Sequence, residues 1–309
     1  MRRAFRRLVL PMLALGLMAA ACGGDDDGSA QAPTTTAGGS GDAPTTTESD
    51  SPASFPADST MATLRDKGKV VIGVKFDQPL FGFKNPTNNQ VEGFDVEIGK
   101  LLAERLFGDD ADDNVEFVET VSRVREESIE QGKVDMVIAT YTINAARKER
   151  VDFAGPYYTA GQDILVRKDD TSITSVQDLN GRKVCTVQGS TSLTNVQQQA
   201  PQADLSITFE RYSQCVEAML DGRVDAVTTD NVILLGFVND DPDAVKLVNN
   251  PFTQEPYGIG VRKGDTVFRN WINDQLEAMG EDGSFEEAWT ATAGKTGQPT
   301  PPAPKPDRY

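Results

Sequence analysis

Two successive runs of alternating strand and helix patterns follow Thr63, and they constrain the fold more than any other feature of the sequence. Strands that alternate with helices are typical of a parallel sheet covered by helices, so the sequence predicts an α/β fold. The first run predicts strands at 69–76, 115–120 and 134–140 with helices at 94–107 and 124–131, and the second predicts strands at 182–189, 206–212 and 224–230 with helices at 191–200 and 214–222.

Two local echoes relate the runs to each other. The hexapeptide GKVDMV at 132–137 matches GRVDAV at 222–227, and PYYTAGQDILVRKDD at 156–170 matches PYGIGVRKGD at 256–265. The latter pair has the pattern of strands that leave a lobe, so we expect the chain to pass from one lobe to a second and back. The expected parts are lobe 1 at 59–161 and 266–292, hinge crossings at 162–167 and 255–265, and lobe 2 at 168–254. Such lobes bind ligands in a cleft at the carboxyl ends of their strands and close over them about the hinge.

The charge balance excludes several classes of function. The 309 residues include 30 Lys and Arg against 47 Asp and Glu, and four of the arginines lie within the first seven residues. The remaining 26 basic residues face 47 acidic ones, a net charge of −21 that opposes nucleic-acid phosphates and anionic lipid surfaces. The chain has no His, which excludes imidazole-based triads and, with three Cys, an ordinary zinc site. We expect no cofactor and no nucleic-acid partner.

The first 22 residues have the layout of an export signal. A basic start precedes an apolar run and the small residues Ala19, Ala20 and Ala21, and Cys22 follows. The run is too short to span a membrane, so residues 1–21 are predicted to be a signal peptide. The ending resembles a bacterial lipoprotein box, which implies a lipidated Cys22 and a protein anchored to the outer face of the cell membrane; ordinary secretion with an incidental Cys22 is the alternative. Residues 22–58 and 293–309 lack the apolar residues of a core, so we expect a flexible tether and a disordered tail.

Two further cysteines remain once Cys22 is assigned to the lipid. Cys185 and Cys215 form an even pair in an exported chain, where oxidising conditions favour a disulfide bond. The alternative is two free, buried thiols.

Four sequence blocks in order resemble the family 3 bacterial extracellular solute-binding proteins, over about 62–292. These are GFDVEI at 93–98 with its following leucines, VIATYTINAAR at 137–147, VDFAGPY at 151–157 and QGST at 188–191. The segments IGVKFDQP and AGQDILVRK and the cysteine pair are most similar to the glutamate-binding lipoproteins of high-GC Gram-positive bacteria. The resemblance implies a two-lobed periplasmic-binding-protein-like fold with two crossing hinge strands, and a monomeric receptor that delivers an amino acid to the permease of an ABC importer.

The resemblance implies that Arg147 binds the α-carboxylate of the ligand. A planar guanidinium presents paired donors that fit a carboxylate, and the amides of a nearby helix start add to them. Ser190 and Thr191 follow a strand and precede a helix, so they offer donors from lobe 2 to the same carboxylate or act as a plain helix cap.

Thr140, Thr142 and Asp230 lie at the ends of two predicted buried strands. The two threonines alternate along one strand and therefore face one side, where they could receive the amino and carboxylate groups of the ligand or cap the chain. Asp230 is the expected partner of the ligand ammonium because a carboxylate only accepts hydrogen bonds.

Lys75 and Arg125 add two cations beyond those that an α-carboxylate needs. Lys75 follows the first strand, where some relatives that bind cationic ligands carry Asp, and Arg125 begins the helix before Gly132. A second negative charge on the ligand would pair with them, so we expect glutamate or aspartate. Gln78 in the same loop suits an amide, which leaves a glutamine or asparagine receptor as an alternative. A dehydratase-type enzyme on the same fold and a sensor domain are further alternatives.

Overall fold

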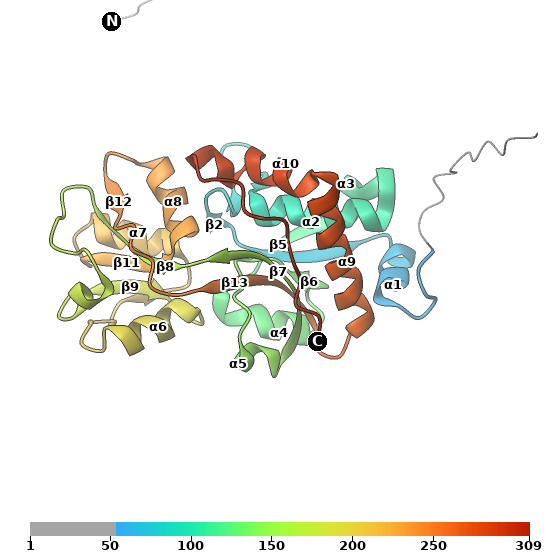
Figure 1. The fold of residues 1–309 in the computed structure, drawn as a ribbon, viewed down its shortest axis with the longest axis horizontal. Helices are drawn as coiled ribbons and strands as arrows, with labels where there is room; N and C mark the ends of the chain where they lie inside the picture. Colours follow the sequence, from blue (N-terminus) through green and yellow to red (C-terminus); the bar gives the residue numbers. More distant parts are fainter. Residues whose placement is uncertain (1–53) are drawn as a thin grey trace, which may run out of the picture. The chain divides into compact units, whose positions relative to one another are not determined.

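Two five-stranded sheets organise the chain in the computed structural model, which describes residues 54–309 (Figure 1). The predicted signal peptide, Cys22 and nearly all of the predicted tether lie outside the described residues. The first sheet has the order β5 (Val115–Glu119), β1 (Val70–Val74), β6 (Met136–Val137), β13 (Glu255–Arg262) and β7 (Val151–Ala160), and the second has the order β10 (Thr208–Phe209), β9 (Val184–Val187), β11 (Ala226–Asp230), β8 (Gln162–Arg167) and β12 (Val245–Leu247).

The two sheets share one topology. In each, three strands run parallel and the fourth is antiparallel to the third. Each sheet forms a lobe with its helices, which confirms the predicted two-lobed α/β fold. A small sheet of β2 (Asp77–Gln78), β3 (Gly82–Lys84) and β4 (Val91–Glu92) extends lobe 1.

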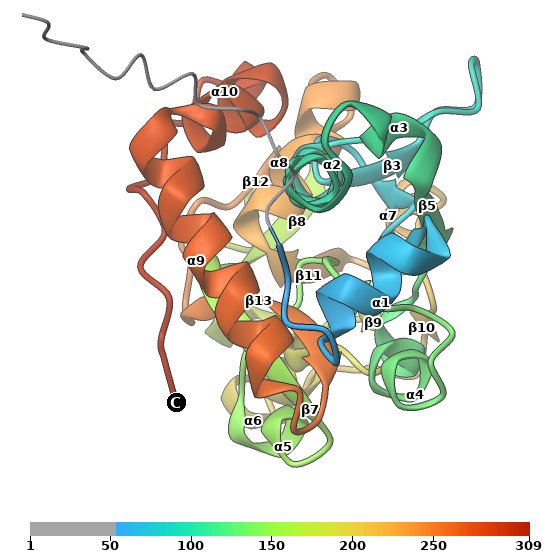
Figure 2. The ribbon, with the colours of Figure 1, turned by 90° about the vertical axis from the view of Figure 1, so that its right-hand side faces the viewer.

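Helices surround both sheets, and within residues 54–309 none is long and apolar enough to cross a membrane. The longest, α9, lies across the first sheet and contacts β7, and Figure 2 shows it beside the C-terminal segment. The α-helices are α1 (Thr60–Lys67), α2 (Phe94–Phe107), α3 (Ala111–Asn114), α4 (Arg125–Glu130), α5 (Ala145–Lys148), α6 (Thr191–Gln199), α7 (Tyr212–Leu220), α8 (Asn231–Asp240), α9 (Thr266–Asp282) and α10 (Ser284–Ala291).

The core of lobe 1 gathers aromatic side chains beneath α2. Phe94, in the first turn of this helix, packs edge-on against Phe285 and Trp289 of α10, with ring centroids 5.4 and 5.2 Å apart. Such contacts stabilise a core beyond the area that they bury. They hold the start of α2 in a fixed place near the ends of the strands.

Two aspartates explain why the Gly-x-Val-Asp motif occurs in both runs. Asp135 accepts a hydrogen bond from the backbone N–H of Val71 at 2.8 Å, and Asp225 accepts one from that of Lys183 at 2.9 Å. Each carboxylate thus ties the loop before one parallel strand to the start of its neighbour. The repeated Gly-x-Val-Asp motif is therefore a scaffold feature of both lobes.

The chain passes between the sheets at two adjacent points. One passage is at Gly161, between β7 and β8, and the other spans 248–254, between β12 and β13. An added Cβ at Gly161 would lie 2.9 Å from Pro251 and 3.0 Å from the Thr253 carbonyl oxygen, so only glycine permits this approach. The segments expected as hinge crossings, 162–167 and 255–265, instead contain β8 and β13, which pair within the sheets of lobe 2 and lobe 1 respectively.

The C-terminal segment differs from the expected disordered tail at 293–309. It begins with a short 3-10 helix and then lies along β7 and α9. The Asp307 N–H donates to the Gly155 carbonyl at 2.8 Å, and the Phe153 N–H donates to the Tyr309 hydroxyl at 3.0 Å. Arg308 pairs with two carboxylates of α9. Polar and aromatic contacts at the very end thus hold a proline-rich segment that has few apolar residues of its own.

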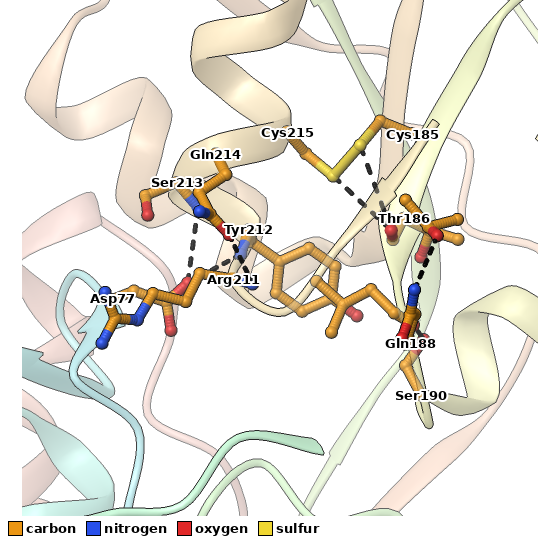
Figure 3. The surroundings of a disulfide bond; sticks show 12 residues. Asp77, Cys185, Thr186, Gln188, Ser190, Arg211, Tyr212, Ser213, Gln214 and Cys215 are labelled. Carbon is orange, nitrogen blue, oxygen red and sulfur yellow. Dashed lines mark hydrogen bonds between the residues drawn. A yellow bond between two sulfur atoms is a disulfide. The ribbon is translucent and has the colours of Figure 1, made fainter. Parts of the chain in front are cut away.

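A disulfide joins Cys185 of β9 to Cys215 of α7 (Figure 3). Both residues are fully buried. The bond fixes α7 against the sheet of lobe 2, and it closes a loop with a sequence separation of 30.

Replacing both Cys185 and Cys215 with alanine should lower the free energy of unfolding by about 3–4 kcal/mol, because the unfolded chain loses the constraint on this loop. Calorimetric unfolding of both proteins measures the change. A reducing agent should lower the melting temperature of the parent protein and leave that of the variant unchanged. Equal melting temperatures for parent and variant would contradict a stabilising disulfide.

Candidate functional site

A small polar cavity lies between the lobes, where parallel strands of both sheets end. Ligand sites of α/β sheets form at such carboxyl ends. Its walls come from both lobes and carry hydroxyl groups, one guanidinium and one carboxylate. The lining residues are Ser122, Arg125, Thr140, Ser190, Thr191, Ser192, Tyr212, Thr229, Asp230 and Ile233.

Arg125 is the cation that lines the cavity itself. Its side chain is buried, stacks over the Tyr141 ring at 4.2 Å and donates to the carbonyls of Ala139 at 3.0 Å and Ser122 at 3.3 Å. These contacts fix the guanidinium at the start of α4. The role of Arg125 toward a ligand stays a prediction.

Lys75 contacts Ser122, one of the residues that line the cavity. The ammonium donates to the Ser122 hydroxyl at 2.8 Å, and the side chain is 2% exposed. Burial and the neighbouring Arg125 together lower the pKa of Lys75 to about 7, although Asp77 opposes the shift. The charge of this ammonium therefore responds to pH near neutrality.

Arg147 lies beside the cavity, in an outer hollow that shares Ser122, Ser190 and Thr191 with it. Asn144 caps the short α5 that carries it. The guanidinium donates to the carbonyl of Thr142 at 2.6 Å and, across the cleft, to that of Gly189 at 3.2 Å. Burial and the nearby Arg125 lower the pKa of Arg147 to about 10, so it stays cationic at neutral pH.

Ser190 and Thr191 form the lobe 2 wall at the start of α6. The Ser190 hydroxyl caps this helix by accepting the Leu193 N–H at 3.2 Å. The Thr191 hydroxyl lies 3.4 Å from that of Thr142 on lobe 1. Ser190 thus serves as a helix cap while it also lines the cavity.

Asp230 supplies the carboxylate of the cavity. One oxygen accepts the Tyr257 hydroxyl at 2.6 Å, and the other has no hydrogen-bond partner among the described residues. Burial and the nearby Glu255 raise the pKa of Asp230 to about 7, although the Tyr257 hydroxyl opposes the shift. The free oxygen is suited to a cationic group of a ligand.

Gln78 is fully buried behind Thr140. Its carbonyl oxygen lies 3.0 Å from the Thr140 hydroxyl, and its amide nitrogen has no hydrogen-bond partner among residues 54–309. An unpaired buried donor is costly unless a ligand satisfies it. The structure thus brings Gln78 together with Thr140 at the edge of the cavity.

Several residues in and around the site were not predicted from the sequence. Ser122 follows β5, so the rule that ligands bind at strand ends could have identified it. Tyr212 follows β10, and its hydroxyl interacts with Ser190, Ser192 and Thr229. Asp95 could have been suspected because it is an acidic residue on the apolar face of α2. No group of His, Cys, Asp and Glu that could hold a metal ion occurs in the part of the chain that the structure describes.

Polar contacts across the cleft hold the lobes together. Asp77 of lobe 1 accepts the backbone N–H groups of Tyr212 at 2.7 Å and Ser213 at 3.3 Å, at the start of α7 (Figure 3). A carboxylate is favourable at this end of a helix. Two exposed ion pairs, Arg211 with Glu119 and Arg123 with Glu210, also join the lobes.

Two α/β lobes joined by adjacent passages, with a polar cavity enclosed between them, define a two-lobed receptor for a small polar solute. The sequence model of the bacterial extracellular solute-binding proteins, family 3, matches residues 70–290. The chain belongs to this family, which confirms the resemblance noted in its sequence and places it in an exported class of proteins.

Individual relatives cover most of the folded part. The ABC transporter glutamine-binding protein GlnH of Bacillus subtilis is 41% identical over 231 residues, which cover 74% of this chain and 83% of GlnH. The glutamate-binding protein GluB of Corynebacterium efficiens is 41% identical over 241 residues, which cover 75% of this chain and 81% of GluB. A solved structure of an ancestral arginine-binding protein bound to glutamine superposes with a TM-score of 0.68 at 38% identity, covering 73% of this chain and 97% of that one.

Replacing Asp77 with alanine should favour the open arrangement of the lobes, because it removes the acceptor of two N–H groups that cross the cleft. Small-angle scattering should then give a larger radius of gyration than for the parent protein. Ser213→Ala is the control, since it keeps the backbone N–H. An unchanged radius for Asp77→Ala would show that this contact does not hold the lobes together.

Proposed function

We propose that this protein is the lipid-anchored substrate receptor of an ABC importer and that it captures glutamate or aspartate. Membership of the solute-binding family and the names of the relatives GlnH and GluB support an amino-acid ligand and a permease partner. The receptor acts as a monomer that delivers its ligand to the membrane subunits.

The charged groups around the cavity favour a ligand that has two carboxylates and one ammonium group. Asp230 has a free oxygen for the ammonium group, and Arg147 supplies a cation for the α-carboxylate, with Thr142 beside it. Arg125 and Lys75 remain, both buried and on the same side of the cavity. Buried cations are costly without a counter-ion, so a ligand with a second carboxylate satisfies this site best.

The amide nitrogen of Gln78 favours the second candidate, a glutamine or asparagine receptor. This donor has no partner among the described residues and suits an amide oxygen as well as a carboxylate. The relative GlnH and the glutamine-bound ancestral protein also support an amide ligand. Calorimetric titration of the purified, ligand-stripped protein against the twenty amino acids separates the candidates. A preference for arginine, lysine or histidine would exclude both of them.

A dehydratase-type enzyme would chemically change its ligand, whereas a receptor returns it intact. The named relatives are binding proteins, which supports the receptor. Nuclear magnetic resonance of the ligand after long incubation tests the difference. Conversion of an aromatic acid to a dehydrated product would favour the enzyme.

Lys75→Met should lower the affinity for glutamate far more than that for glutamine, because only the acid loses a counter-ion. In the parent protein the ratio of glutamate to glutamine affinity should rise as pH falls from about 8 to about 6. The Lys75 pKa of about 7 means that the ammonium gains its proton in this range, while the Asp230 contribution is common to both ligands and cancels.

Titration calorimetry at each pH gives this ratio, and Arg147→Ala is the matched control. That variant should weaken both ligands by similar factors, because the α-carboxylate is common to them. A ratio that stays unchanged in Lys75→Met would assign the selectivity to Arg125 or to Gln78 instead.

Cys22→Ala should release the protein into the medium or leave it unprocessed, because lipidation requires the thiol. Multiple acyl chains give the stable anchoring that one chain cannot. Detergent-phase partitioning of the parent and variant proteins measures the anchor. If the variant partitions like the parent, Cys22 is not the site of attachment.

A further inference from the structure

We propose that Asp95 is a positioning residue of this receptor, which holds the backbone of Thr140 in the conformation that receives the ligand. The inference rests on the proposed function. Asp95 is fully buried in the first turn of α2 and is not among the residues that line the cavity. It therefore acts through Thr140, which does line it.

Thr140 has a backbone conformation that a β-branched residue rarely adopts. Its φ angle is 44°, in the left-handed region. This conformation is strained for threonine and persists only where the surroundings hold it. The Thr140 N–H donates to one oxygen of Asp95 at 2.8 Å, and Arg125 donates to the carbonyls of Ala139 and Thr140 at 3.0 and 3.4 Å. A carboxylate therefore accepts the one N–H of the strained residue.

Asp95 is itself held rigidly. Its own N–H donates to the Phe81 carbonyl at 3.0 Å, and its second oxygen accepts the Tyr157 hydroxyl at 2.7 Å. A Cβ at Gly93, which precedes α2, would lie 2.4 Å from the Phe81 backbone, so the helix starts in direct contact with the loop between β2 and β3. The Asp95 carboxylate thus has little freedom to move with Thr140 if the backbone at Thr140 changes its conformation.

The conformation of Thr140 also sets the place of Gln78. The Thr140 hydroxyl lies 3.0 Å from the Gln78 carbonyl oxygen, which leaves the buried amide nitrogen without a partner among the described residues. If Thr140 relaxed to an ordinary conformation, both its hydroxyl and this amide would move relative to Arg125. Asp95 thereby controls Thr140, which lines the cavity, and Gln78, which the second candidate function assigns to the ligand.

Asp95→Asn keeps the shape of the side chain and replaces the charged acceptor. It should weaken the binding of both L-glutamate and L-glutamine by roughly 5- to 10-fold, because the amide oxygen still accepts the Thr140 N–H but as a neutral and weaker acceptor. Tyr157→Phe is the matched control, because it removes the other bond of Asp95 but keeps the Thr140 N–H bond and the backbone contact with Phe81 that places the carboxylate. It should change either affinity by no more than about threefold, as expected for a site not coupled to the ligand.

Thr140→Gly provides the decisive background, because glycine adopts the left-handed conformation without strain. In that background, Asp95→Asn should change either affinity by no more than about threefold, so the two substitutions are strongly coupled. An equal loss with Thr140 and with Gly at this position would overturn the proposal.

If Asp95→Asn alone does not fold, the double variant should fold and bind like Thr140→Gly. A double variant that fails to fold, or that binds much more weakly than Thr140→Gly, would also overturn the proposal. Failure of the proposed function is a different result, since the parent protein would then bind neither amino acid.

Discussion

Burial of charged groups at the ends of the strands is the constraint on which the site depends. A cation removed from water is costly unless hydrogen bonds or opposite charges compensate it. Arg125 and Lys75 meet part of this cost by donating to backbone carbonyls and to a hydroxyl respectively. Arg147 donates to a backbone carbonyl and also pairs with Glu126 at 3.5 Å. Burying a carboxylate has a similar cost, and Asp77 and Asp95 offset it by accepting hydrogen bonds from backbone N–H groups. The sheets, caps and aromatic core bring these partners within reach of one another.

Backbone groups are effective hydrogen-bond partners for these buried charges because the fold fixes their positions. Arg147 uses a carbonyl of lobe 2, and Asp77 uses two N–H groups of the same lobe. The compensation of lobe 1 charges is therefore complete only when the lobes are close together. Closure of the cleft and burial of charge are coupled in this architecture, and a charged ligand enters the same balance.

The fold could be predicted from the sequence because its signals are local. Strand and helix periodicity, the repeated Gly-x-Val-Asp motif and the polar residues after each strand give the two lobes and most of the cavity wall. The prediction fails where contacts between distant segments decide the result. The left-handed Thr140, which Asp95 holds from 45 positions away, has no local signal in a sequence that reads as a regular strand. The C-terminal segment is ordered by Tyr309 and Arg308, and its composition alone indicates disorder.

That segment also has a consequence for how copies of the protein meet. β7 lies at the edge of the first sheet, so one side of it has no neighbouring strand. Exposed strand edges are templates for pairing between molecules. The last residues of the chain bond to the N–H of Phe153 and the carbonyl of Gly155, and Tyr309 lies against the charged ends of Lys148 and Arg269. The protein thereby covers the edge strand of its first sheet. This cover opposes edge-to-edge pairing between neighbouring receptor molecules.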